Sequence, residues 1–106
     1  MDNFTAVYKI LASLEAQMDL EKANPEAFSA EALGVSRERW KKYLRMMAEA
    51  DYISGVRYES FVDGGGVLRI DDIRLTLKGL EYLQDNSMMR KVYRSLKGIK
   101  DAIPGL

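Results

Sequence analysis

The sequence predicts a mainly helical α+β fold: a winged helix-turn-helix with a two-stranded wing and extra helices at the N- and C-terminal ends. A short helical stretch (residues 30–33), the tight turn Gly34-Val35-Ser36 and a longer helical stretch follow one another. Two β-rich stretches then flank Asp63-Gly64-Gly65-Gly66, a turn sequence typical of a hairpin. With 106 residues, 47% of them hydrophobic and 30% charged, the chain has the size and composition of one globular domain.

We expect residues 1–106 to form a single winged-helix domain. Its parts are an N-terminal helix (1–20), the helix-turn-helix (30–50), the wing hairpin (51–75) and the C-terminal helices (76–103). The N-terminal helix is predicted from apolar residues that recur at steps of three and four and therefore share one helix face. These residues are Phe4, Val7, Tyr8, Leu11, Leu14 and Met18.

Capping residues mark where the short helices begin and end. Asn24-Pro25 combines an N-cap residue with proline at the first helical position, and Ser29 offers a second N-cap just before residues 30–33. Gly34 comes next and can adopt the left-handed conformation that ends a helix. Ser36 is then expected to cap the longer helix.

That longer helix is the predicted recognition helix. Its buried stripe is expected to contain Trp40, Tyr43, Leu44 and Met47, and its outward face Arg37, Glu38, Lys41, Lys42, Arg45 and Glu49. After it, residues 56–62 and 67–73 read as the two strands of the wing. A register that pairs apolar residues with each other and a cation with an acid places Val62 opposite Val67, Arg57 opposite Asp72 and Val56 opposite Ile73.

Two helices are predicted at the C-terminal end. Thr76 caps the first, whose packing face is expected to contain Leu77, Leu80 and Leu83. The second runs from residue 88 to about residue 103, and its apolar seam contains Val92, Leu96, Ile99 and Ile103. A helix of this length is marginal in isolation and must bury its seam. The seam either completes the core of the domain or joins two copies of the chain as a homodimer.

Composition limits the classes of function. The chain has no Cys and no His, so disulfides, the usual zinc, iron and copper ligand sets, and a histidine partner for a serine nucleophile are all missing. It also lacks an apolar run near the length of about 20 residues that spans a bilayer, and a signal-peptide start. We therefore expect a cytoplasmic, non-enzymatic protein with no catalytic residues, metal, cofactor or membrane partner.

Positive charge is concentrated in two stretches, although the net charge is zero. Residues 36–50 carry five bases and two acids, and residues 87–106 carry five bases and one acid. A helix that enters the major groove needs outward basic and hydrogen-bonding side chains. The candidates for contact with double-stranded DNA are Ser36, Arg37, Lys41, Lys42 and Arg45. The alternative is an ordinary solvated helix face, since Glu38 and Glu49 interleave with these cations.

The wing supports a second possible function. Its acids Glu59, Asp63, Asp71 and Asp72 outnumber its bases Arg57, Arg69 and Arg74, which disfavours contact between the wing and DNA. Because Phe61 and Val62 lie near the tip, the hairpin could instead meet a protein partner or pack within the molecule. The second candidate is therefore a protein-interaction or assembly module that retains the winged-helix fold without DNA binding and uses the hairpin or the last helix.

Several stretches contain specific sequence motifs: 29–36 (SAEALGVS), 75–83 (LTLKGLEYL), 86–89 (NSMM), 97–100 (KGIK) and 103–105 (IPG). In these stretches the chain resembles the YjcQ family, small and often prophage-borne proteins of Gram-positive bacteria. The resemblance implies a winged-helix fold and, through that fold, DNA binding. It implies no catalytic or ligand-binding residues. Together with the basic recognition helix, it leads us to expect a prophage-associated DNA-binding protein that acts as a transcriptional regulator.

Overall fold

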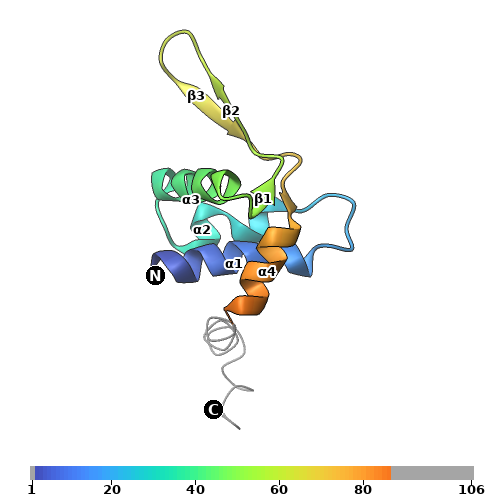
Figure 1. The fold of residues 1–106 in the computed structure, drawn as a ribbon. Helices are drawn as coiled ribbons and strands as arrows, with labels where there is room; N and C mark the ends of the chain where they lie inside the picture. Colours follow the sequence, from blue (N-terminus) through green and yellow to red (C-terminus); the bar gives the residue numbers. More distant parts are fainter. Residues whose placement is uncertain (1, 87–106) are drawn as a thin grey trace.

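The computed structural model describes residues 2–86, and its elements follow one another in the order of a winged helix (Figure 1). The helices are α1 (Asn3–Ala16), the 3-10 helix η1 (Pro25–Phe28), α2 (Ala30–Leu33), α3 (Arg37–Glu49) and α4 (Leu77–Asp85). The strands are β1 (Ile53–Ser54), β2 (Arg57–Ser60), β3 (Gly66–Arg69) and β4 (Arg74–Leu75). This mainly helical α+β arrangement confirms the predicted fold class. The predicted last helix, with Val92, Leu96, Ile99 and Ile103, lies outside the described residues.

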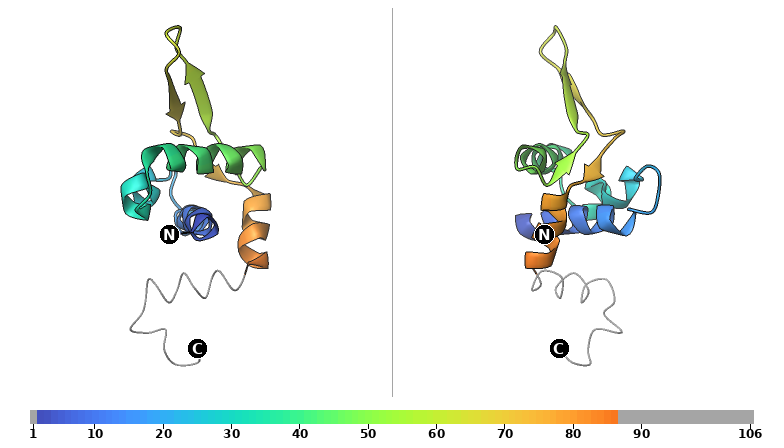
Figure 2. Two further views of the ribbon diagram at one scale, coloured as in Figure 1. Left: turned by 90° about the vertical axis from the view of Figure 1, so that its left-hand side faces the viewer. Right: turned by 45° about the vertical axis from the view of Figure 1, so that its right-hand side comes forward.

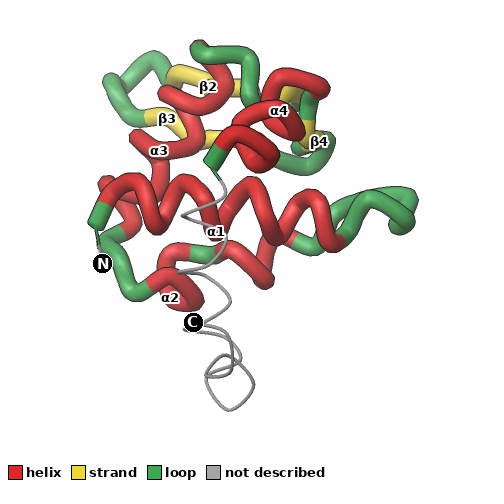
Figure 3. Tube along the Cα trace, turned by 60° about the horizontal axis from the view of Figure 1, so that its bottom comes forward, coloured by secondary structure: helices red, strands yellow, loops and turns green. Residues whose placement is uncertain are grey.

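The helices form a compact body from which the β2–β3 hairpin projects (Figures 1 and 2). Helix α1 crosses the middle of this body, as the tube in Figure 3 shows, and contacts η1, β4 and α4. Helix α3 lies between α1 and the hairpin. We call residues 55–72 the wing and the other described residues the body. Among the described residues, no helix combines the length and the apolar character needed to cross a bilayer.

Local capping bonds explain where the helices begin. The side chains of Ser29, Ser36 and Thr76 accept hydrogen bonds from backbone N–H groups three residues later, at 3.0–3.1 Å, as predicted. The cap of α1, Asp2, was not predicted; its carboxylate accepts bonds from the N–H (3.0 Å) and the hydroxyl (2.7 Å) of Thr5. These bonds hold the pKa of the Asp2 carboxyl below its usual range.

The turn between α2 and α3 is fixed by Gly34 and by one buried hydrogen bond. Gly34 has a φ of 71°, the left-handed conformation that ends α2, as predicted. Trp40 of α3 donates its indole N–H to the backbone oxygen of Phe28 at 2.8 Å, which ties α3 to η1. All four residues predicted for the buried stripe of α3, namely Trp40, Tyr43, Leu44 and Met47, are buried.

The predicted apolar face of α1 is right in its centre and wrong at both ends. Tyr8, Leu11 and Leu14 are buried, whereas Phe4 is 70% exposed and Met18 56% exposed. Helix α1 ends at Ala16, before Met18, rather than at residue 20. Because neighbours cover α1 on several sides, residues outside the predicted stripe, such as Ile10, are also fully buried.

Helix α4 packs through a different face from the one predicted. Leu83 is buried and Leu80 is half-buried, but Leu77 is 75% exposed. The packing face is centred on Gly79 and Leu83, because a Cβ at Gly79 would lie only 2.3 Å from the backbone oxygen of Tyr52. This close approach turns Leu77, which lies on the opposite side of the helix, toward solvent.

The predicted register of the wing was wrong by three residues. In the structure Arg57 faces Arg69 rather than Asp72, and Val67 faces Glu59 rather than Val62. The remaining pairs of the β2–β3 ladder are Tyr58 with Leu68 and Ser60 with Gly66, and β1 pairs with β4 through Ile53 with Leu75 and Ser54 with Arg74. Val56 and Ile73 belong to neither ladder.

The shape of the wing tip explains this shift. The loop closes between Phe61 and Gly65, whose backbone N–H and oxygen lie 2.6 Å apart. The carboxylate of Asp63 accepts a hydrogen bond from Gly65 N–H at 3.0 Å, which folds the tip further. Val62 is therefore part of the loop and fully exposed, so it cannot pair across the hairpin. The turn is longer than the glycine run alone suggested.

Candidate nucleic-acid interface

Helix α3 presents a basic outward face. Its buried stripe packs into the body, so the charged residues lie on the solvent side: Arg37, Glu38, Arg39, Lys41, Lys42, Arg45 and Glu49. Five of these are cations and two are acids. Arg37, Lys42 and Arg45 are exposed, and Lys41 is half-buried. The cations predicted to contact DNA thus share one accessible surface.

The first turn of α3 is preorganised by Ser36. Its side-chain oxygen accepts a hydrogen bond from the N–H of Arg39 at 3.1 Å, and its hydroxyl proton remains a donor. The first N–H groups of a helix have no partner within the helix, so they are available to an anion. Glu38 stands in this first turn and lowers the local positive potential.

Lys41 and Arg45 already have side-chain partners. The ammonium of Lys41 lies 3.6 Å from a carboxylate oxygen of Glu38, an exposed pair one helical turn apart that contributes about 0.5 kcal/mol or less. The guanidinium of Arg45 lies over the ring of Tyr58 in β2, 5.0 Å from its centroid. A cation–π contact at an exposed site contributes about 0.5–1 kcal/mol. Arg45 therefore joins the recognition helix to the wing.

Gly66 makes room for this contact. A Cβ at Gly66 would lie 2.4 Å from the phenolic oxygen of Tyr58, so only glycine allows the Tyr58 ring to lie across β3. Sequence reasoning missed the pair because Arg45 and Tyr58 belong to different elements. A guanidinium has five N–H donors, and a contact with a ring does not use the donors that point away from it. Arg45 can therefore contact a phosphate while it stays on Tyr58.

The acids of the wing are largely engaged. Glu59 accepts a hydrogen bond from Arg69 at 2.8 Å, and Asp72 lies 3.8 Å from Arg74. The hydrogen bond from Arg69 and its positive charge hold the pKa of Glu59 below its usual range. The same bond and the negative charge of Glu59 raise the pKa of Arg69. Asp63 is used by the tip turn. These partners order the acids but leave them charged, so the wing keeps the excess of negative charge that disfavours contact with a polyanion.

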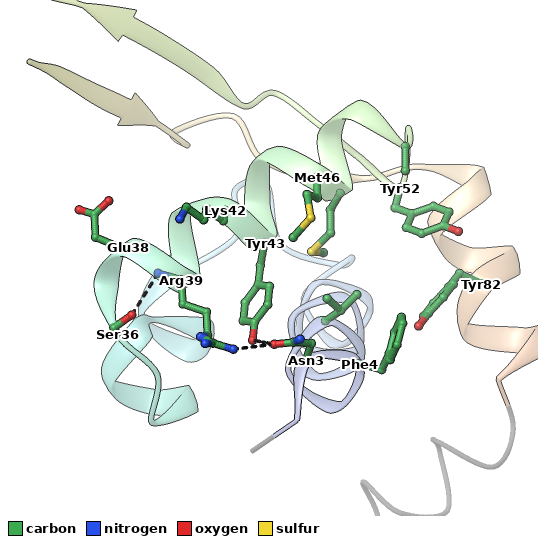
Figure 4. A pocket seen from close by; sticks show the side chains of 13 residues that line it. Asn3, Phe4, Ser36, Glu38, Arg39, Lys42, Tyr43, Met46, Tyr52 and Tyr82 are labelled. Atoms are coloured by element: carbon green, nitrogen blue, oxygen red, sulfur yellow. Dashed lines mark hydrogen bonds between the residues drawn. The ribbon is translucent and has the colours of Figure 1, made fainter. Parts of the chain in front are cut away.

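The other flank of α3 faces α1 and borders a cavity of about 640 Å³ (Figure 4). Asn3 lies between Arg39 and Phe4, and its side-chain oxygen accepts hydrogen bonds from Arg39 at 2.9 Å and from the hydroxyl of Tyr43 at 2.5 Å. Toward one end lie Tyr52 and Tyr82, whose ring centroids are 5.0 Å apart. Burial raises the pKa of Tyr82. Among the described residues, no group of three or more acidic side chains could hold a metal ion.

Comparison with known families decides the classification. A family model described as YjcQ protein matches residues 8–102. The chain belongs to the YjcQ family. No curated protein and no solved structure gives a match.

The matched region of the YjcQ family contains the helix-turn-helix, the wing and α4. Every residue predicted to contact DNA lies within it, as does the Arg45–Tyr58 contact. Asn3 and Phe4, which line the cavity, lie before it. Membership of the family classifies the domain but assigns no role to individual side chains, whose roles follow from their contacts.

Proposed function

We propose that this YjcQ-family protein is a non-enzymatic, cytoplasmic DNA-binding protein of prophage origin that acts as a transcriptional regulator. The observation that supports this proposal best is the outward basic face of α3, which stands beside a wing that is joined to it through Arg45 and Tyr58. An exposed helix of this size fits the major groove, which is about 12 Å wide. Phosphates would supply affinity, and base edges would supply sequence choice.

The contacts divide the predicted residues into four groups. Ser36 and Arg37 lie at the start of α3, where N–H groups and an exposed guanidinium can meet a phosphate together. Arg45 would bind the DNA backbone from the wing side while its guanidinium stays over Tyr58. Lys42 is exposed on the side of this face that borders the cavity. Lys41 lies on the line from Arg37 to Arg45 but must first leave Glu38. We therefore expect Lys41 to contribute least.

A fluorescence anisotropy titration against random and phage-derived duplexes over a salt series tests the proposal. If Arg37 and Lys42 each neutralise one phosphate, Arg37→Ala and Lys42→Ala should each reduce the log–log salt slope by about 0.9. Lys22→Ala is the matched control, because Lys22 is exposed in the loop between α1 and η1. Absence of binding at low ionic strength would refute DNA binding. An unchanged salt slope for a variant would show that the substituted residue does not contact a phosphate.

The tip of the wing supports the second candidate, a protein-interaction module. Phe61 is 53% exposed and the neighbouring Val62 is fully exposed, so the tip presents two large apolar side chains to solvent. If the tip joins copies of the chain, light scattering should show an oligomer that the double variant Phe61→Ser, Val62→Ser converts to a folded monomer. A monomer at all concentrations would exclude self-association through the tip.

A further inference from the structure

We propose that the cavity between α1, α3 and α4 binds a small amphipathic organic anion, with one carboxylate or sulfonate attached to a flat apolar body. We call it the α1–α3 cavity. Its volume of about 640 Å³ falls in the range of about 300–1,000 Å³ typical of small-molecule sites. The cavity shares Ser36 and Lys42 with the proposed DNA-binding face, but its other lining residues lie outside that face, and the inference does not depend on DNA binding.

Most of the wall of the α1–α3 cavity is apolar. It is formed by Phe4 and Val7 of α1, Met46 and Met47 of α3, and Tyr52 and Tyr82 (Figure 4). Phe4 and Met46 are each more than half exposed, although most large apolar residues of the body are buried. An apolar ligand in the cavity would cover both side chains. Methionine adapts to ligands of different shape because its side chain is unbranched and flexible.

One end of the cavity is cationic. Arg39 and Lys42 line this end, and Arg39 is held there by its 2.9 Å hydrogen bond to Asn3. A guanidinium has five N–H donors, so one bond to Asn3 leaves others for an anion. Glu38 also borders the cavity, but its carboxylate lies 3.6 Å from the ammonium of Lys41. An anionic head group therefore suits this end better than a neutral or cationic one.

Two probes with the same aromatic body test this assignment. 1-Anilinonaphthalene-8-sulfonate carries a sulfonate, whereas N-phenyl-1-naphthylamine lacks it, and the fluorescence of both rises in apolar sites. The full chain should bind the sulfonate with one-to-one saturation and at least about tenfold more tightly than the neutral probe, the usual effect of a charge-assisted hydrogen bond. Arg39→Gln should remove most of this difference and leave the affinity for the neutral probe unchanged.

Arg37→Gln is the matched control, because Arg37 lies one half-turn earlier in α3 and does not line the cavity. It should leave the affinities for both probes unchanged. Met46→Gln should weaken the binding of both probes, since Met46 belongs to the apolar wall. Because Met46 is exposed, the substitution should not disturb the fold. Arg39 is not among the residues proposed to contact DNA, so its variant separates a failure of this inference from a failure of DNA binding.

Three results would overturn the proposal. Equal effects of Arg39→Gln and Arg37→Gln would show that the anion does not bind at the Arg39 end. Probe binding that survives Met46→Gln would place the probe elsewhere, for example on the exposed wing tip. Absence of saturable binding of the sulfonate probe by the full chain would refute the site directly.

Discussion

Different interactions stabilise the body and the wing. Among residues 2–86, every buried apolar residue belongs to the body, and no residue from 55 to 72 is buried. The wing depends on its β-ladder, on the bonds of the tip loop, and on the contacts of Glu59 with Arg69 and of Tyr58 with Arg45. Substitutions in the body should therefore change the stability of the whole domain, whereas substitutions in the wing should change its position relative to α3.

A pair of identical substitutions tests this contrast most strongly. Phe28→Ala removes a ring that is fully buried in the body, so the free energy of unfolding should fall by about 3–5 kcal/mol. Phe61→Ala removes the same ring from the exposed wing tip and should change it by less than about 0.5 kcal/mol. Urea denaturation followed by tryptophan fluorescence measures both. Losses of similar size would show that the wing tip is covered in solution.

Gly79 provides a second test within the body. In most helices, replacing glycine by alanine stabilises the helix by about 1 kcal/mol. Here the new Cβ would lie 2.3 Å from the backbone oxygen of Tyr52 and 2.7 Å from a methyl group of Leu75. Gly79→Ala should therefore lower the free energy of unfolding by about 1–3 kcal/mol.

Thermal denaturation measures this change, with Gln84→Ala as the control because Gln84 is exposed in the same helix. The control should be nearly neutral. A stabilised Gly79→Ala protein would show that α4 can move away from the loop before β1, and the close packing described for this helix would be wrong.

The features that sequence predicted well are local. Ser29, Ser36 and Thr76 cap helices through bonds to residues only three positions away, so neighbouring residues determine them. The buried stripe of α3 was also predictable, because one side of that helix meets the body and the other is charged. The order of helices, turn and hairpin then restricts the domain to a winged helix.

The features that sequence missed depend on distant parts of the chain. Both strands of the wing lack a clear apolar alternation, so their register depends on the geometry of the tip loop. Whether Phe4 and Leu77 are buried depends on which elements cover α1 and α4. The contacts of Arg45 with Tyr58 and of Arg39 with Asn3 join different elements, and no spacing along the sequence indicates them.

The contact between Arg45 and Tyr58 links the body to the wing, and we expect its removal to have a smaller effect. In a double-mutant cycle of Arg45→Gln and Tyr58→Ala, the coupling free energy should be about 0.5–1 kcal/mol. The wing amides, but not those of the α1 core, should shift in NMR spectra of both single variants. Tyr58→Phe is the control, since it keeps the aromatic face. Coupling near zero would show that the wing is positioned by its ladder alone.

The smallest expected effect is a pH dependence of the wing. Arg69 holds the pKa of Glu59 below its usual range, so the ion pair stabilises the wing above the ordinary Glu pKa of about 4.3. This stability should be lost as the pH falls through the lower pKa of the folded state. An NMR titration of the Glu59 carboxyl measures it. Arg69→Gln should raise this pKa toward the ordinary value, and Arg57→Gln should raise it less, because Arg57 is the weaker of the two influences.

The pKa of Glu59 should respond to salt differently from the pKa of Asp2, the carboxyl that caps α1. The pKa of Glu59 is lowered by the hydrogen bond from Arg69 and by its charge, whereas the pKa of Asp2 is lowered by hydrogen bonds from Thr5, which is neutral. Dissolved ions screen exposed charges over about 3 Å at 1 M ionic strength but do not compete in the same way with a short hydrogen bond. Added salt should therefore raise the pKa of Glu59 more than that of Asp2. Equal shifts would mean that the charge of Arg69 contributes little and that hydrogen bonds hold the pKa of the carboxyl down in the wing as they do in the body.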